Sequence, residues 1–224
     1  MCGFFLSQKK DGNLSSKLLR HRGPDDYKFY EDNYLKINNY RLSIVDQNKI
    51  NTHPTLSKSG NTLITFNGEI YNYLHLKKKY SLVCNTSSDT EVLFLLLIKI
   101  GLKKTLKEIE GMFSFVFLDT KLKKILCARD HFGQKPFYYF FNKSGLICST
   151  NLKPIVKSLK NISFNKKNVF KYLCSSGILE SNQTIFKNIY ALKAGHFMIY
   201  KKNKLIIKRY FHPADLFDIK LCNR

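Results

Sequence analysis

The chain opens with Met1-Cys2-Gly3-Phe4-Phe5-Leu6, a start that leads directly into an apolar segment. Cysteine is small enough for the initiator methionine to be removed, so Cys2 can become the mature N-terminus. Its free α-amino group, with a reference pKa of roughly 7.7–8.0, then lies on the same residue as its thiol. One residue can therefore hold both a nucleophile and its base. The alternative is that Cys2 is a small buried hydrophobic residue at the start of a strand.

Beyond this start, the pattern of apolar residues predicts a domain rich in strands. Runs of Val, Ile, Phe and Tyr are bounded by Asn, Gly and Lys, which is typical of strands joined by turns. The predicted strands are residues 62–66, 113–118, 125–128, 136–141, 146–148, 197–200 and 205–208. The predicted helices are residues 12–19, a helix starting at 88, 153–159 and 166–174. Strands in consecutive hairpins with helices between them indicate an α+β layered domain.

Composition narrows the class of protein. The chain has 224 residues, is 44% hydrophobic and contains no repeat or Pro/Gly-rich linker, so we expect one globular domain. Its net charge of +22 comes from scattered lysines, which favours a solvated basic surface over a nucleic-acid site. The six cysteines show no zinc spacing, and no apolar run is long enough for a membrane span. We expect a reduced, cytoplasmic protein without a metal, a membrane partner or a nucleic-acid partner.

The dipeptide Asn67-Gly68 has two interpretations. Asn-Gly between two apolar runs is the strongest short-range indication of a β-hairpin. The functional alternative is an oxyanion hole, in which the Asn67 amide and the Gly68 backbone N–H bind a tetrahedral intermediate. Glycine would let the backbone approach that intermediate closely.

Two charged residues also have a structural and a functional interpretation. Ser88 and Glu91 have the spacing of a capping box. The negative charge of Asp89, in the first turn, interacts favourably with the positive end of the helix dipole. The same Asp89 could receive a substrate ammonium group. Arg41 lies in the apolar segment 40–46 and is either an arginine at a strand end or a fork for a carboxylate. Together with Cys2 and Asn67, these groups supply what is needed to hydrolyse the side-chain amide of a free amino acid.

The order of these segments resembles the class II glutamine amidotransferases, and within them the glutaminase half of asparagine synthetase. The resemblance covers nearly the whole chain. It passes through residues 1–3, 21–26, 41–46, 67–72, 88–92, 111–115, 129–136 and 192–196.

The resemblance implies a four-layer αββα sandwich of the N-terminal-nucleophile (Ntn) hydrolase type, with a domain at residues 2–212. Residues 213–224 would be a C-terminal tail or the start of a linker to a synthetase domain. It implies that Cys2 forms a thioester with L-glutamine and releases ammonia and glutamate. The catalytic residues would be Cys2, Asn67 and Gly68. The glutamine-binding residues would be Arg41, Leu42, Ser43, Ile44, Val45, Asn67, Gly68, Glu69 and Asp89. Segment 22–24 would shape a loop near the site.

The resemblance also implies a partner. The Ser-Gly-Gly-x-Asp-Ser loop that binds pyrophosphate in synthetase domains is absent from this sequence. No cofactor is therefore expected in this chain, and ATP and Mg²⁺ are expected only for a synthetase domain or subunit that uses the ammonia. A homodimer is a further assembly to consider. The alternatives are a catalytically idle remnant that binds glutamine or a partner and, less favoured, a basic nucleic-acid-binding module.

Overall fold

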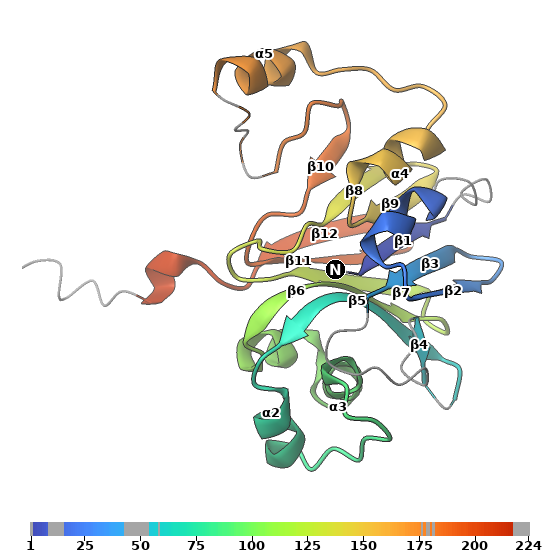
Figure 1. Ribbon diagram of the computed structural model, residues 1–224, viewed down its shortest axis with the longest axis vertical. Helices are drawn as coiled ribbons and strands as arrows, with labels where there is room; N and C mark the ends of the chain where they lie inside the picture. Colours follow the sequence, from blue (N-terminus) through green and yellow to red (C-terminus); the bar gives the residue numbers. More distant parts are fainter. Residues whose placement is uncertain are drawn as a thin grey trace, which may run out of the picture.

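The computed structural model describes residues 2–8, 16–42, 54–57, 59–175, 177, 180 and 182–216, which form two stacked antiparallel sheets (Figure 1). Sheet A has the strand order β10-β8-β9-β1-β3-β2, and sheet B has the order β12-β11-β7-β6-β5-β4. The strands of sheet A are β1 (Gly3–Ser7), β2 (Asp26–Glu31), β3 (Lys36–Arg41), β8 (Tyr138–Asn142), β9 (Gly145–Ser149) and β10 (Ile189–Ala191). Those of sheet B are β4 (Thr55–Leu56), β5 (Thr62–Ile70), β6 (Gly111–Asp119), β7 (Lys124–Arg129), β11 (His196–Lys201) and β12 (Lys204–Arg209).

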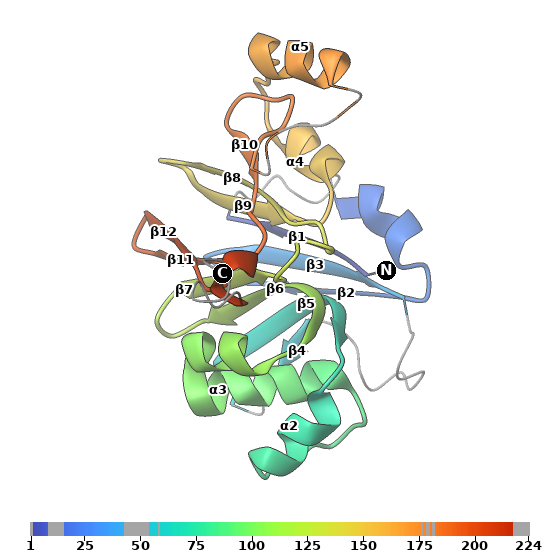
Figure 2. The same cartoon turned by 90° about the vertical axis from the view of Figure 1, so that its left-hand side faces the viewer.

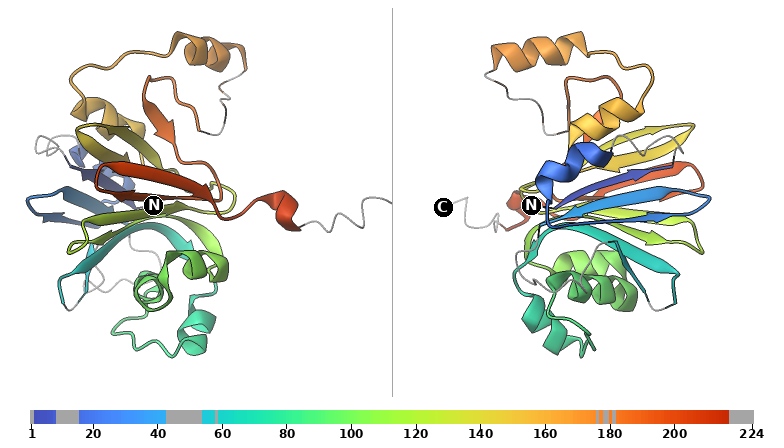
Figure 3. Two further views of the ribbon diagram at one scale, coloured as in Figure 1. Left: turned by 180° about the vertical axis from the view of Figure 1, so that it is seen from behind. Right: turned by 45° about the vertical axis from the view of Figure 1, so that its right-hand side comes forward.

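Helices cover the outer faces of both sheets and complete four layers (Figure 2). Helices α2 (Tyr73–Lys79) and α3 (Asp89–Glu108) pack on sheet B through one apolar cluster. The 3₁₀ helix η1 (Lys17–Arg22) and helix α4 (Leu152–Ser158) pack on sheet A through a second. Helix α5 (Lys166–Cys174) lies beyond α4, away from the sheets (Figure 3), and the 3₁₀ helix η2 (Pro213–Leu216) follows β12.

The central strand β1 shows why the layers form. Side chains alternate between the two faces of a strand. Phe4 and Leu6 therefore enter the cluster between the sheets, and Phe5 enters the cluster under η1 and α4. Both faces are covered, so every residue of β1 is buried. Because β1 pairs with β3 on one side and β9 on the other, the N-terminal end of the chain lies in the middle of a sheet.

Most of the predicted elements are confirmed. Each of the seven predicted strands overlaps an observed strand, and the helices predicted at 153–159 and 166–174 correspond to α4 and α5. Of the helix predicted at 12–19, residues 12–15 lie outside the described residues. The remaining part overlaps the 3₁₀ helix η1, which begins at Lys17. In the apolar segment 40–46, β3 ends at Arg41, and residues 43–46 lie outside the described residues.

The predicted hairpin at Asn67-Gly68 is wrong. Strand β5 runs without a turn from Thr62 to Ile70 and pairs along its whole length with β6. The hairpin interpretation assumes that neighbouring apolar runs pair with each other, whereas β5 pairs with a strand that follows two helices. Gly68 has a different structural role. A Cβ at this position would lie 2.1 Å from the Met112 carbonyl oxygen and 2.7 Å from the Phe113 Cα, so only glycine permits this approach of the strands.

Helix α3 begins at Asp89 as expected, but the capping box does not form. The Ser88 hydroxyl oxygen accepts a hydrogen bond from the Thr90 N–H at 3.2 Å. The Glu91 carboxylate accepts hydrogen bonds from the backbone N–H groups of Asn85 and Thr86 instead of reaching back to Ser88. The N–H groups of Asn85 and Thr86 belong to no strand and need another acceptor. The Glu91 carboxylate supplies it and thereby holds the segment that leads into α3. No helix in the described part of the chain is long and apolar enough to cross a membrane.

Candidate active site

Strand register places Cys2 beside the end of β3. Gly3 pairs with Tyr40, so the residue before β1 lies next to Arg41 and Leu42. The Cys2 Sγ accepts a hydrogen bond from the Leu42 N–H at 3.5 Å, and its S–H donates to the Leu42 carbonyl at 3.6 Å. The backbone of Leu42 is thus in direct contact with the predicted nucleophile. Ser43, Ile44 and Val45, which were predicted to line the same pocket, lie outside the described residues.

The charges around Cys2 come from separate elements. Burial raises the pKa of the Cys2 thiol, and the Leu42 hydrogen bond and the positive charge of Arg41 lower it. The negative charge of Asp89 raises the same pKa. A thiol senses only charges that lie nearby. The structure therefore brings Cys2, Arg41 and Asp89 together, although they come from the N-terminus, the end of β3 and the start of α3.

Asp89 is held against the end of β5. It is only 5% exposed, and its Oδ2 accepts a hydrogen bond from the Ile70 N–H at 2.9 Å. Its Oδ1 accepts one from the Thr90 hydroxyl at 3.4 Å. Burial raises the pKa of Asp89, and the nearby negative charge of Glu69 raises it further. The carboxylates of Asp89 and Glu69 therefore lie close enough for their charges to interact.

Asn67 occupies the inner face of β5, where it is fully buried. Its Nδ2 donates to the Ser114 hydroxyl at 3.5 Å, while its Oδ1 has no hydrogen-bond partner among the described residues. A buried amide oxygen without a partner is costly. The Asn67 amide is therefore only half satisfied by the protein and retains capacity to bind something in the site.

The loop that precedes β2 supports the predicted nucleophile. Arg22, at the end of η1, donates from Nε to the Cys2 carbonyl at 3.5 Å. The next residue, Gly23, lies so close to the Tyr40 carbonyl that a Cβ would be 2.3 Å from its oxygen. Segment 22–24 therefore contacts both β3 and Cys2, and its supporting role stays a prediction.

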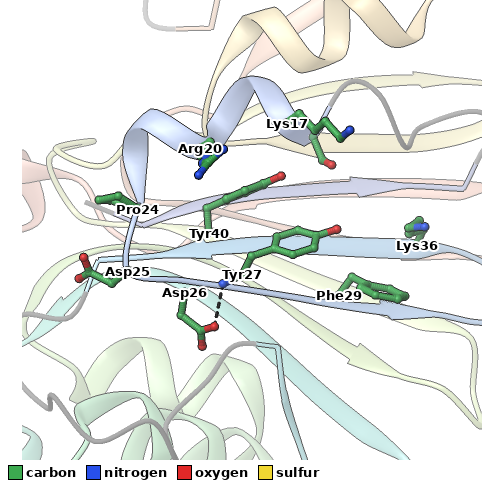
Figure 4. Close-up of a pocket in the computed structure, with 11 residues that line it drawn as sticks. Lys17, Arg20, Pro24, Asp25, Asp26, Tyr27, Phe29, Lys36 and Tyr40 are labelled. Carbon is green, nitrogen blue, oxygen red and sulfur yellow. Dashed lines mark hydrogen bonds between the residues drawn. The ribbon is translucent and has the colours of Figure 1, made fainter.

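An open groove of about 1030 Å³ lies on the other side of this loop, between η1 and β2 (Figure 4). It is lined by cationic groups from η1 and by aromatic rings from β2 and β3. Neither Cys2 nor Asp89 lines it, so this groove is distinct from the predicted glutamine site.

The segment from Arg129 to Lys135 also reaches the site, and sequence reasoning assigned no role to it. The side chains of Arg129 and Asp130 are bonded to the backbone of this segment, and the charge of Lys135 interacts with that of Cys2. Within the described part of the chain, no cluster of His, Cys, Asp and Glu side chains could hold a metal ion.

Known proteins have sequences similar to that of this chain. A protein described as asparagine synthetase [glutamine-hydrolyzing] 2 of Methanocaldococcus jannaschii is 35% identical over 225 residues, which cover 91% of this chain and 43% of the relative. Asparagine synthetase [glutamine-hydrolyzing] 2 of Bacillus subtilis is 34% identical over 187 residues, which cover 80% of this chain and 25% of the relative. The chain thus spans less than half the length of either relative.

Solved structures share the fold. The glutamine phosphoribosylpyrophosphate amidotransferase of B. subtilis superposes with a TM-score of 0.65 at 14% identity, covering 94% of this chain and 49% of that one. This likeness confirms the predicted four-layer αββα sandwich of the Ntn-hydrolase type. A family model described as a glutamine amidotransferase domain matches residues 1–211. Because that match spans nearly all of the 224 residues, the chain belongs to the glutamine amidotransferase domain family.

Proposed function

We propose that this chain hydrolyses L-glutamine to glutamate and ammonia through a thioester on Cys2. The observation that carries the proposal is that Arg41 and Asp89, with opposite charges, both lie close enough to Cys2 to act on the pKa of its thiol. A free amino acid carries a carboxylate and an ammonium group on its α-carbon. Arg41 binds the first of these, and Asp89 with Glu69 binds the second. The side-chain amide of glutamine then points at the sulfur.

The chemistry follows from this placement. The α-amine of a mature N-terminal Cys2, through a water molecule, takes the thiol proton. The thiolate attacks the amide carbon, and the Asn67 amide and Gly68 N–H bind the resulting oxyanion. The intermediate collapses with transfer of the proton to the leaving nitrogen, so ammonia departs and a C–S thioester remains. Water then attacks the thioester carbon, which frees glutamate and restores the thiol.

The half-satisfied amide of Asn67 supports its role. Rotating the amide by 180° lets the Ser114 hydroxyl donate to Oδ1 and frees the Nδ2–H₂ group as a donor. One rotation therefore removes the unpaired buried oxygen and supplies the donor that an oxyanion hole requires.

We further propose that the ammonia serves asparagine synthesis from aspartate. The support is the similarity to relatives named as glutamine-hydrolysing asparagine synthetases. An ATP- and Mg²⁺-dependent synthetase domain or subunit would be the partner. We place the protein in the cytoplasm, since the cysteines of the described residues are free thiols.

The test compares the chain with Cys2→Ala and with the matched control Cys84→Ala. We expect wild type and Cys84→Ala to release glutamate and ammonia in equal amounts and Cys2→Ala to release neither. A glutamine-like diazoketone should label Cys2 alone, as read by peptide mass spectrometry. Labelling without turnover would identify a glutamine-binding remnant, and labelling at Cys84 or Cys148 would show that Cys2 is not the nucleophile.

A further inference from the structure

Ser114 is a fully buried polar residue that lies directly opposite Asn67. Strands β5 and β6 are neighbours in sheet B (Figure 1), and their register pairs Asn67 with Ser114. Both residues have an exposed fraction of 0%. Residues directly opposite each other in antiparallel strands have their side chains on the same face of the sheet. The two polar side chains therefore meet in the interior, where an unsatisfied polar group costs free energy.

The alternation of side chains along β6 places Ser114 between the two sheets. Phe113 and Phe115 belong to the apolar cluster under α2 and α3, whereas Val116 belongs to the cluster between the sheets. Successive residues of a strand face opposite sides, so Ser114 shares the face of Val116. Strand β6 also pairs with β7, where Ser114 lies opposite Arg129. The backbone of Ser114 is thus held on both sides.

Two glycines bring β5 and β6 close together beside this pair. A Cβ at Gly68 would lie 2.1 Å from the Met112 carbonyl oxygen. A Cβ at Gly111, on the other strand, would lie 2.1 Å from the Glu69 carbonyl oxygen. Only residues without a Cβ permit this approach. The separation of the Asn67 and Ser114 side chains is therefore set by the sheet itself.

The contact between the two side chains leaves hydrogen-bonding capacity unused. The Asn67 Nδ2 donates to the Ser114 Oγ at 3.5 Å, which is long for a hydrogen bond. The Asn67 Oδ1 has no partner, and the Ser114 hydroxyl proton has no acceptor in the part of the chain that the structure describes. Rotation of the amide by 180° exchanges its oxygen and nitrogen. The Ser114 hydroxyl then donates to Oδ1, and the amide hydrogens are directed away from Ser114.

A second hydroxyl and amide in the same interior already have this arrangement. Thr65 lies two residues before Asn67 on β5 and therefore on the same face. Its hydroxyl donates to the Asn39 Oδ1 at 2.8 Å, and the Asn39 Nδ2 has no partner among the described residues. Both residues have an exposed fraction of 0%. A buried hydroxyl thus holds an asparagine amide by its oxygen and leaves the nitrogen as a spare donor.

We propose that Ser114 is a positioning residue that acts through Asn67: its hydroxyl donates to the Asn67 Oδ1 and so holds the amide hydrogens toward the oxyanion formed on glutamine. This inference rests on the proposed function for the identity of that oxyanion. An amide free to rotate would present its oxygen to the oxyanion in part of the molecules. Ser114 removes that alternative and supplies the preorganised donor that an oxyanion site requires.

The first experiment measures glutamate release over a range of glutamine concentrations. We expect Ser114→Ala to lower kcat about tenfold, the factor that one buried hydrogen bond contributes, while KM changes less than about twofold. Ser114→Thr keeps the hydroxyl and should retain most of kcat. In the Asn67→Ala background, Ser114→Ala should lower kcat no further, because the group that it positions is gone.

The matched control is Thr65→Val, which removes the other buried hydroxyl from the same face of β5. We expect its kcat to equal that of wild type, although both variants lose a buried hydrogen bond. Urea unfolding measures that loss in each variant. A purely structural role of Ser114 predicts lower stability with unchanged kcat, as in the control.

The second experiment reads the orientation of the amide without glutamine. Neutron diffraction from crystals of the perdeuterated protein locates the deuterons of Asn67 and Ser114. We expect the two deuterons on the Asn67 Nδ2 to face away from Ser114, and the deuteron on the Ser114 Oγ to point at the Asn67 Oδ1. This readout decides the inference even where Ser114→Ala does not fold.

Three outcomes overturn the inference: amide deuterons that face Ser114, a kcat of folded Ser114→Ala equal to wild type, or an equal loss of kcat from Ser114→Ala with and without Asn67. A wild-type chain that holds the amide as proposed but never hydrolyses glutamine refutes the proposed function. It leaves the orientation of Asn67 by Ser114 intact.

Discussion

Replacing Asp89 by Asn separates a substrate-binding role from a structural one. A substrate-binding role predicts a large loss of activity without loss of stability, and a structural role predicts a loss of stability without loss of activity. Asp89 is 5% exposed and accepts the Ile70 N–H at 2.9 Å. Asparagine has nearly the same shape, and its Oδ1 can accept the same hydrogen bond. Packing is therefore preserved. The variant removes the charge and replaces the oxygen that accepts the Thr90 hydroxyl by an NH₂ group.

The expected change in stability follows from the pKa of Asp89. Burial raises this pKa above its value in the unfolded chain. Between the two values the folded state binds more protons than the unfolded state, so stability falls as pH rises through the folded pKa. Each unit of elevation costs about 1.4 kcal/mol of unfolding free energy at neutral pH. Asp89→Asn removes this cost, whereas loss of the helix-dipole contact costs only about 0.3–1 kcal/mol. We expect the variant to be at least as stable as wild type at pH 8, with the advantage vanishing in acid.

The expected change in activity is large and unfavourable. Losing a desolvated charge-assisted bond to the substrate ammonium should cost about 2–4 kcal/mol in kcat/KM. The assays are urea unfolding at pH 4 and pH 8 and glutamate release over a range of glutamine concentrations. Asp119→Asn is the matched control, because the Asp119 Oδ1 also accepts a backbone N–H, that of Leu122, at 2.8 Å. A variant of Asp89 with a lower melting temperature and wild-type kinetics would show that the residue is structural.

Three further predictions concern the predicted nucleophile and β5. Asn67→Ala should lower kcat about 10²–10³-fold with little change in KM, since an oxyanion donor acts mainly in the transition state; a higher KM with unchanged kcat would contradict this role. Gly68→Ala should lower the unfolding free energy by about 1–3 kcal/mol, as measured in urea, because its Cβ would lie 2.1 Å from the Met112 carbonyl oxygen; unchanged stability would mean that β5 and β6 can separate there. Intact-mass spectrometry should show loss of Met1, and a purified form that keeps Met1 yet hydrolyses glutamine at full rate would exclude the Cys2 amine as the base.

The sequence was sufficient for most of the long strands and for α3, α4 and α5, but it did not indicate β2, β4, β10 or α2, and it did not indicate how the strands pair. Apolar runs bounded by Asn, Gly and Lys mark strands because such residues suit a pleated, half-buried surface. Pairing depends on distant partners, so the local pattern at Asn67-Gly68 predicts a hairpin where β5 continues. The capping box failed for a related reason: the spacing of Ser88 and Glu91 is correct, but Asn85 and Thr86 offer the carboxylate competing donors.

The same division applies to the candidate site. The residue types of Cys2, Arg41 and Asp89 pointed to their chemistry, and the structure brings their charges together. Lys135 could not be singled out among so many lysines, because burial of a lysine cannot be read from sequence and is rare. The one indication was the sequence around it, in which an Arg-Asp pair and a glycine precede the lysine within one short segment.

The central place of β1 also determines when the domain can assemble during synthesis. Phe4 at the N-terminal end of the chain bonds to Thr150, which the ribosome adds 146 residues later. At about 5–20 residues per second, the first strand waits on the order of ten seconds for that partner. The two sides of β1 are closed at very different times, by β3 early and by β9 late. A nascent chain therefore carries Cys2 without its framework, and the site proposed for glutamine is complete only when most of the domain has been synthesised.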